Sequence, residues 1–436
     1  MNPFFHNPQN MNLQIVSRYV PIENQAGHFS YLLELLHYLH GAGFCMELDV
    51  LDPWFLQEDI PDDLHEIVDV VLMPMSYIQT DWNSASTLDP SLKPFLRPIY
   101  QRLPTSLLKP LRQAWYRFRR TPLPGYHIAD AAATEAEMTF VADRLAVARP
   151  AVLMSNETFL GNLLTLCQHE TEVLKVNIAF DVQHKRQETF RKTGIIHSSS
   201  IWNRQKEVDL LSAADVIVAI HHEEADIFQD MLPEAEIVCA PMAVRFHQHH
   251  EKQQVRGRCL FVGSDIEHNV YGLKWFLNEV WPLVDRVLPT SELHVCGTVC
   301  AKITDSTQNV KLLGKVEDLD QEYAEAKLCI IPLIAGSGLK IKLVEALSHG
   351  RACVSTSIGI QGVRELEGKA VLVAEAPETF ANAILTVLKD EKKRQAMELE
   401  AKQYVTENLS PENVYRPFMK RIEQHLIHFQ KRKESL

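Results

Sequence analysis

A glycine-rich turn followed by a helix with one lysine and one glutamate on the same face is the sequence feature best suited to chemistry. The turn contains Gly336 and Gly338, and Lys342 and Glu345 lie three residues apart on the helix, so they share one stripe. The first amides of a helix suit a phosphate, because they lack partners and carry partial positive charge. The pattern predicts a nucleotide-sugar site, with Lys342 on the diphosphate and Glu345 on the ribose. The alternative is a simple ion pair worth about 0.2–0.5 kcal/mol.

The elements that must position these residues alternate regularly along the chain. Short, mostly apolar segments, such as Leu174–Ala179 and Cys259–Val262, are separated by longer amphipathic stretches, such as Leu339–His349. This alternation predicts an α/β protein with parallel sheets. A length of 436 residues exceeds one ordinary core, so two domains are expected. The polar segment 247–258 separates them, and its histidines are interpreted as a solvated linker, because no cysteine or carboxylate cluster accompanies them.

The segment from Cys329 to Gly362 resembles the donor-binding core of GT-B glycosyltransferases, in particular the large retaining family that includes sucrose and mannosyl transferases (glycosyl transferases group 1). The residues that carry the resemblance form a glycine turn, a lysine and a Glu-Ala helix: Gly336, Gly338, Lys342, Glu345, Ala346 and Gly350. The resemblance covers about residues 205–410. It implies the GT-B fold, in which two Rossmann-like domains with parallel sheets face a central cleft.

The resemblance also implies a domain arrangement. We expect an N-terminal acceptor domain over 1–246, with a basic helical insertion at about 91–120. A nucleotide-sugar donor domain is expected over 259–410. A C-terminal helix over 411–436 is expected to cross back to the N-terminal domain.

By the same resemblance, the activity is transfer of a sugar from a nucleotide-diphosphate sugar to an acceptor hydroxyl in glycan, polysaccharide or glycolipid synthesis. Retention of configuration is expected, without a metal or a cofactor. Donor-binding residues are expected in the turn, on the helix and in two further loops: Gly336, Ser337, Gly338, Leu339, Lys340, Glu345, Gly263, Ser264 and Gly362. The usual pattern has Glu where Ser337 stands and Arg where Ser264 stands. Which lysine neutralises the leaving diphosphate, Lys340 or Lys342, is therefore left open.

A second group of candidates follows a buried strand in the N-terminal half. Asp181 ends that strand, and His184 and Arg186 come directly after it, at the sheet edge where ligands bind in parallel sheets. Asp181, His184 and Lys342 are the predicted catalytic residues, although Asp181 as a turn cap is an open alternative. Arg186 is assigned to the acceptor side. A turn with Gly27 and His28 after the first strand is assigned there too, against an ordinary strand-to-helix turn.

One segment reverses the charge of an otherwise acidic chain. Residues 91–120 hold eight Lys and Arg residues, interleaved with aromatic residues, and no Asp or Glu, whereas the whole chain has a net charge of −12. Such a segment suits contact with an anionic membrane surface or a phosphate-bearing acceptor. A solvated insertion that pairs with acids elsewhere is the alternative. The overall acidity argues against nucleic-acid binding.

Bulk features place the chain in the cytoplasm, with peripheral contact at the inner face of the membrane as a further option. Eight cysteines lie mostly in apolar runs, as in reduced proteins, and no run is long enough to span a membrane. The N-terminus lacks the pattern of a signal peptide. Two alternative functions stay open: a catalytically silent nucleotide-sugar or glycan-binding partner of another transferase, and a nucleotide-sugar epimerase on the same fold.

Overall fold

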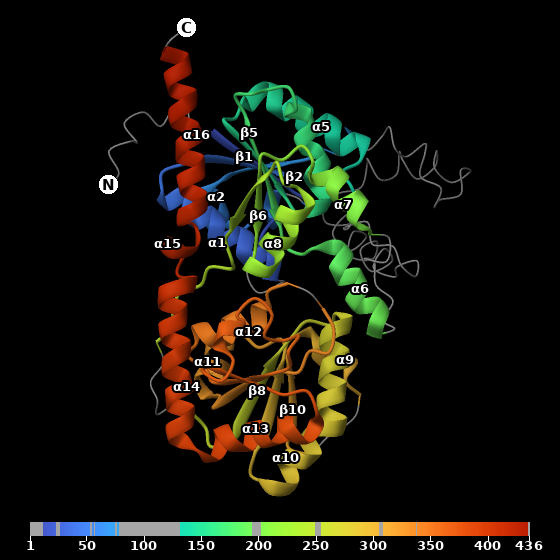
Figure 1. Ribbon diagram of the computed structural model, residues 1–436, viewed down its shortest axis with the longest axis vertical. Coiled ribbons are helices and arrows are strands. Elements are labelled where there is room, and N and C mark those ends of the chain that lie inside the picture. Colours follow the sequence, from blue (N-terminus) through green and yellow to red (C-terminus); the bar gives the residue numbers. More distant parts are fainter. Residues whose placement is uncertain are drawn as a thin grey trace, which may run out of the picture.

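The chain forms two α/β domains, one above the other in Figure 1, with the last helices running along one side of both. This is a computed structural model, and it describes the following ranges: 12–22, 27–52, 55, 57–74, 76–77, 131–193, 202–248, 254–304, 308–336 and 338–434. The basic segment 91–120 lies outside them, and so does Ser337. The expected α/β fold with two parallel sheets is confirmed.

The N-terminal domain is built on a seven-stranded sheet of order β3-β2-β1-β4-β5-β6-β7, in which every pair is parallel. Its strands are β1 Asn12–Ser17, β2 Cys45–Val50, β3 Asp69–Leu72, β4 Val152–Asn156, β5 Leu174–Ala179, β6 Val216–Ala219 and β7 Glu236–Cys239. β4, β5 and β6 are buried at every position. Helices on both faces explain this burial, which also takes in the polar residues Ser155, Asn156, Lys175 and Asn177.

Helices follow most of these strands. They are α1 Gly27–Gly41, α2 Asp62–Ile67, α5 Glu135–Ala148, α6 Gln183–Thr193, α7 Arg204–Leu211 and α8 His222–Met231, with 3-10 helices η2 Gln57–Asp59 and η6 Thr158–Cys167. α5 begins with a capping box in which Thr134 and Glu137 exchange side-chain and backbone hydrogen bonds. Glu137 also pairs with the buried Arg18 at 2.9 Å, which fixes the segment after β1 against α5.

The C-terminal domain repeats the same winding with six parallel strands in the order β10-β9-β8-β11-β12-β13. Its strands are β8 Arg258–Val262, β9 Glu292–Cys296, β10 Val310–Gly314, β11 Leu328–Ile331, β12 Cys353–Ser355 and β13 Val371–Val373. In both sheets the order reverses next to the first strand, between β1 and β4 and between β8 and β11. Loops at the carboxyl ends of the strands diverge at such a reversal and leave room for a ligand.

The helices of this domain are α9 Glu267–Trp275, α10 Trp281–Val287, α11 Leu319–Glu325, α12 Ile341–Ser348, α13 Pro377–Lys389 and α14 Glu391–Tyr404. Shorter pieces are η9 Phe276–Val280, η10 Thr298–Lys302, η11 Arg364–Leu366 and η12 Val405–Leu409, of which η9 and η12 are π-turns. The sequence predicted one helix over Tyr271–Val284. The structure instead has a π-turn before Trp281, because Pro282 follows and cannot donate to the helical ladder.

The chain crosses between the domains twice on the same side. After α14 come α15 Pro411–Val414 and α16 Arg416–Glu434, and α16 pairs with the N-terminal domain through Arg421 and Glu236 at 2.6 Å. The two crossings meet where the amide of Val244 donates to the carbonyl of Leu409 at 2.8 Å. His247 lies in the linker between the domains and stacks on the ring of His349 in the C-terminal domain, with centroids 4.2 Å apart.

An apolar cluster joins the crossing helices to the N-terminal domain. Tyr31 of α1 packs edge-on against Phe180 and Tyr415, with ring centroids 5.0 and 6.2 Å apart, and its hydroxyl donates to the carbonyl of Ala240. Each of these aromatic side chains is buried. The cluster therefore fixes the start of the crossing helix to the base of the N-terminal sheet.

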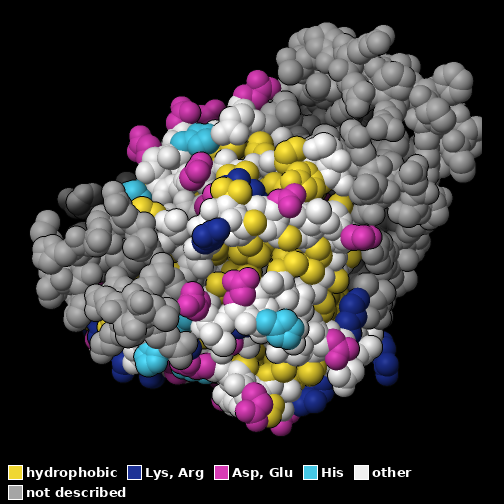
Figure 2. Space-filling view, turned by 90° about the horizontal axis from the view of Figure 1, so that it is seen from above, with side chains coloured by type: hydrophobic (Ala, Val, Ile, Leu, Met, Phe, Trp, Pro, Cys, Tyr) yellow, Lys and Arg dark blue, Asp and Glu magenta, His cyan; other side chains and the backbone are white. Residues whose placement is uncertain are grey.

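The upper face of the molecule carries a mixed surface. Figure 2 shows apolar side chains gathered in its middle with acidic and histidine side chains around them, and its described atoms form no continuous field of Lys and Arg. Among the helices of the described ranges, none combines the length and the apolar character that crossing a bilayer requires.

Candidate functional site

The loop between β11 and α12 is shaped by two glycines in the left-handed region. Gly336 has φ +124° and Gly338 has φ +73°. A Cβ added at Gly338 would lie 2.7 Å from Oδ1 of Asp181 and 3.2 Å from the carbonyl of Phe180. The two domains therefore approach each other closely at this loop, and only glycine fits there.

Lys340 ends the loop as the N-cap of α12, so the helix begins two residues later than the sequence predicted. Its backbone is extended, and its Nζ turns back to donate to the carbonyl of Gly338 at 2.7 Å and to Oε1 of Gln361 at 3.2 Å. Burial lowers the pKa of Lys340 to about 7, and the carboxylates of Asp181 and Glu224 oppose that change. A desolvated ammonium thus lies among the loop, the N-terminal domain and the segment after β12.

Lys342 reaches in a different direction, toward the loop that follows β8. Its Nζ donates to Oδ1 of Asn269 at 2.6 Å, and Nδ2 of Asn269 donates to the carbonyl and Oγ of Ser264 at 3.0 and 3.2 Å. Burial lowers the pKa of Lys342 to about 8, against the attraction of Glu345. The structure therefore brings a cation beside Ser264, the position where the family pattern described above has Arg.

Glu345 lies one turn further along α12 and is only partly buried. Its Oε2 accepts a hydrogen bond from the hydroxyl of Tyr323 at 3.3 Å. Burial raises the pKa of Glu345 to about 6, while Lys342 and Tyr323 oppose the rise. Lys342 and Glu345 are each held by a neighbour from another helix, which argues against the simple ion-pair alternative.

Two further donor candidates lie beside this loop. Gly362 has φ +89°, and a Cβ there would lie 2.6 Å from Cδ1 of Leu339. The amide of Gly263 donates to the carbonyl of Cys296 at 3.0 Å. A Cβ added at Gly263 would lie 2.8 Å from the ring of Phe261. All described donor candidates therefore lie at the carboxyl end of the C-terminal sheet, around the reversal between β8 and β11.

The N-terminal candidates lie at the start of α6, across from this loop. Arg186 Nη1 donates to Oδ2 of Asp181 at 2.8 Å. His184 is buried, and its Nδ1 lies 2.7 Å from Oε2 of Glu207, which also accepts the amides of Gln183 and His184. Asp181 therefore faces the glycine loop, whereas His184 is fixed by a carboxylate behind it. The catalytic role of each stays a prediction.

The sequence alone assigns no role in the site to three residues that hold it together. Asn269 links Lys342 to Ser264, and Tyr323 holds Glu345. Glu224 accepts the amide of Val182 at 3.2 Å, and burial raises its pKa against the opposing effect of His221. No local pattern marks these roles, because each partner comes from a distant part of the chain.

Three candidates lie at or beyond the limits of the described part. α1 begins at Gly27, which has no side chain, whereas the side chain of His28 and the whole of Ser337 lie outside the described part.

Comparison with known proteins agrees with this geometry. Residues 256–390 match the family model described as Glycosyl transferases group 1. An uncharacterized 44.6 kDa protein in the cps region of Klebsiella pneumoniae is 23% identical over 283 residues, which cover 62% of this chain and 70% of that protein.

Solved structures share the whole two-domain fold. A TarM variant from S. aureus, in complex with Fondaparinux, alpha-GlcNAc-glycerol and UDP, matches with a TM-score of 0.67 and 11% identity over 94% of this chain and 99% of that one. Anabaena HepE in complex with UDP and glucose matches with a TM-score of 0.58 and 13% identity over 95% and 100%. The architecture is the GT-B fold.

Proposed function

We propose that this GT-B chain, whose residues 256–390 match glycosyl transferases group 1, is a retaining glycosyltransferase. It transfers a hexosyl group from a UDP-sugar to a hydroxyl of a glycan, polysaccharide or glycolipid acceptor. The choice of UDP is supported by the complexes of similar structures: TarM with UDP and HepE with UDP and glucose. The acceptor class is supported by the glycan ligands in the TarM complex.

One observation carries the proposal: two lysines and the amino end of α12 meet at the reversal point of the C-terminal sheet. Lys340 lies under the glycine loop and Lys342 lies beside Ser264. Anions bind at such helix ends, and desolvated cations there interact strongly because the local dielectric is low. Both lysines have lowered pKa values, so binding a diphosphate would compensate for their burial.

The chemistry required is cleavage of the bond between the anomeric carbon and the diphosphate. Negative charge develops on the departing phosphate oxygen, and donors already aimed at that oxygen lower the barrier. The amides at the start of α12 and the ammonium of Lys342 would supply this stabilisation. Glu345 would hold the ribose hydroxyls and fix the position of the nucleotide along the helix.

The opposite side of the reaction would be provided by the N-terminal domain. Asp181 lies against Gly338 and is held by Arg186 at 2.8 Å. A carboxylate at this point faces the region where a sugar on the diphosphate would lie. We propose that Asp181 orients the sugar or the attacking hydroxyl.

Calorimetric titration of UDP against Glu345→Ala tests the donor site. A hydrogen bond to a charged group contributes about 1.5–3 kcal/mol, so the dissociation constant is expected to rise about 10- to 100-fold. Glu400→Ala, an exposed glutamate on α14, is the matched control and should bind UDP like wild type. Equal affinity in the Glu345→Ala and Glu400→Ala proteins would refute the assignment.

The second candidate is a catalytically silent nucleotide-sugar-binding partner. Ser264 and Ser337, which stand where the related proteins carry Arg and Glu, favour it. Hydrolysis of a panel of UDP-, GDP- and dTDP-sugars distinguishes the two. Slow hydrolysis of one donor supports the transferase, whereas tight UDP binding without any turnover supports the silent partner.

A further inference from the structure

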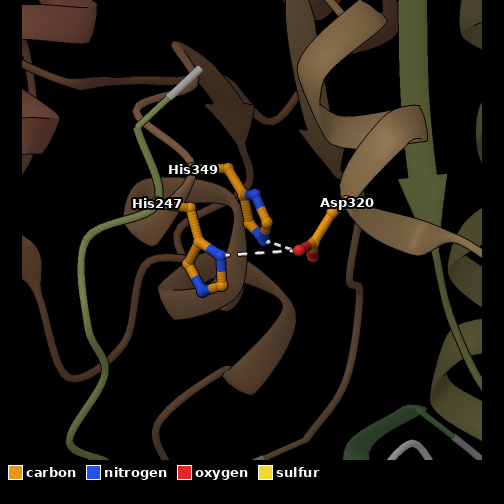
Figure 3. A group of neighbouring side chains, drawn as sticks. All are labelled: His247, Asp320 and His349. Carbon is orange, nitrogen blue, oxygen red and sulfur yellow. Dashed lines mark ion pairs between the residues drawn. The ribbon is translucent and has the colours of Figure 1, made fainter.

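We propose a Zn²⁺ site formed by His247, Asp320 and His349, separate from the diphosphate site. The three side chains come from three segments: the linker after β7, the first turn of α11 and the C-cap of α12. Figure 3 shows the two rings lying together, each with a nitrogen directed at the carboxylate of Asp320. This inference goes beyond glycosyl transfer and does not depend on it.

The distances suit ligands around an ion. Nδ1 of His247 lies 3.6 Å from Oδ2 of Asp320, Nε2 of His349 lies 3.6 Å from Oδ1 of the same carboxylate, and one ligand atom from each residue lies within 4.8 Å of the others. A direct hydrogen bond would hold these atoms about 2.7–3.2 Å apart. Tetrahedral zinc with bonds of about 2.0–2.2 Å separates its ligand atoms by roughly 3.3–3.6 Å. The two nitrogen–oxygen distances therefore match the second arrangement better than the first.

The ring orientations are fixed by stacking. His349 is buried between two rings, with centroids 4.3 Å from Tyr323 and 4.2 Å from His247. The amide of His247 also donates to the carbonyl of Ser348 at 2.8 Å, which fixes the linker against the end of α12. Two imidazole nitrogens and a carboxylate oxygen are ligands that zinc prefers.

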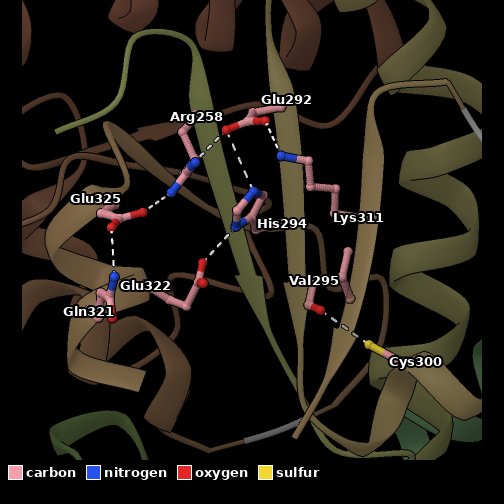
Figure 4. A network of polar contacts seen from close by, with 9 residues as sticks. All are labelled: Arg258, Glu292, His294, Val295, Cys300, Lys311, Gln321, Glu322 and Glu325. Atoms are coloured by element: carbon pink, nitrogen blue, oxygen red, sulfur yellow. Dashed lines mark hydrogen bonds and ion pairs between the residues drawn. The ribbon is translucent and has the colours of Figure 1, made fainter. Parts of the chain in front are cut away.

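The helix that carries Asp320 is held by a charged network whose other members lie on β8 and β9. Arg258 bridges Glu292, at 2.7 Å, and Glu325 of α11, and His294 lies 2.7 Å from Glu322 of α11 (Figure 4). Two strands therefore fix α11 from the side opposite the proposed ion. Ligands held in place before binding lose less conformational freedom when the ion arrives.

An ion at this point would connect the linker to both helices beside the nucleotide site. His349 follows Glu345 by one helical turn, and Tyr323 contacts both residues. Zinc binding would thus restrain the first crossing between the domains and the helix that carries Glu345.

The test uses the full-length chain without a histidine tag, in a Cys45→Ser background, because Cys45 is an exposed thiol that also binds metals. ZnCl₂ is titrated calorimetrically, and CoCl₂ serves as a spectroscopic probe. We expect one ion per chain, a tetrahedral cobalt spectrum without thiolate bands and a higher melting temperature with zinc. Asp320→Asn and His349→Gln should each weaken zinc binding at least about tenfold. Removing a residue that only supports a metal ligand already costs about this much affinity, so removing a ligand should cost no less. His65→Gln, an exposed histidine on α2, is the control.

Asp320→Asn decides the matter even if His349→Gln does not fold, because the Asp320 side chain is 62% exposed and its amide replacement keeps the shape. Unchanged zinc affinity in Asp320→Asn would overturn the site. A second result would also overturn the site: the His249→Gln, His250→Gln double variant loses zinc binding while Asp320→Asn keeps it. The ion would then bind to linker histidines alone. Thiolate bands in the cobalt spectrum would also refute the assignment.

Discussion

Replacing Lys342 with methionine tests whether the buried ammonium of Lys342 binds the diphosphate. Methionine has a similar length and no charge, so it keeps most of the packing on Asn269 while removing the ammonium. Burial lowers the pKa of Lys342 from 10.5 to about 8 in the folded protein. Between these two values the unfolded chain binds a proton that the folded chain does not. The free energy of unfolding contributed by this group therefore rises with pH.

The size of the effect follows from those two pKa values. Between about pH 7 and about pH 9.5, Lys342 should add about 2 kcal/mol to the free energy of unfolding. Lys340 and, in the unfolded chain, the cysteine thiols also titrate in this range, but they are present in both proteins. The difference between wild type and Lys342→Met should change by about 2 kcal/mol over this pH range, with a smaller contribution from Lys340, whose pKa the charge of Lys342 also lowers.

The assay is urea unfolding of both proteins at several pH values, together with calorimetric titration of UDP. Wild-type UDP affinity should fall above about pH 8, where the free Lys342 loses its proton, and Lys342→Arg should reduce that fall because arginine stays charged, leaving the part due to Lys340. Lys342→Met should bind UDP weakly at every pH. A difference in unfolding free energy that is constant with pH would show that the ammonium is solvated. Wild-type UDP affinity in Lys342→Met would show that it does not contact the diphosphate.

Two further variants test the contacts between the domains. Gly338→Ala should lose about 1–3 kcal/mol of unfolding free energy and most transfer activity, because φ is +73° and the new Cβ would lie 2.7 Å from Asp181. Gly368 has φ +76° and open space around it, so Gly368→Ala should lose only the unfolding free energy due to backbone strain. Equal losses in Gly338→Ala and Gly368→Ala by urea unfolding would argue against the clash with Asp181. Arg364→Ala removes a 2.7 Å pair with Glu223 that is about half exposed, and should cost no more than about 1 kcal/mol in the same assay. A larger loss would mean that the pair controls how the domains meet.

Much of the fold could be predicted because the strands are buried on both faces. Cys259–Val262 is an uninterrupted apolar run, and Leu174–Ala179 is mostly apolar with Lys175 and Asn177 within it; both segments form strands. α12 was also predicted, since Lys342 and Glu345 stand out on an otherwise apolar helix. Its start was placed two residues too early, because the extended backbone of Lys340 depends on contacts with the segment after β12 that no local pattern shows.

The contacts within the site could not be predicted in the same way. Lys342 meets Asn269, 73 residues earlier in the chain, through the pairing of β8 with β11. His247 looked like part of a polar linker, and its proximity to Asp320 appears only once three segments are folded together. Residue type and spacing reveal groups on one element, whereas partners from different elements depend on the topology.

The hydrogen bond between Val244 and Leu409 has a mechanical consequence. Both connections between the domains, the linker after β7 and the segment after α14, pass this point. We therefore expect the domains to rotate about it as about a hinge. The widest excursion then falls on the far side, where α6 and α9 lie in Figure 1. A bulky acceptor would accordingly enter from the side of α6. A crosslink at the hinge would leave this entrance open, whereas a crosslink between α6 and α9 would close it.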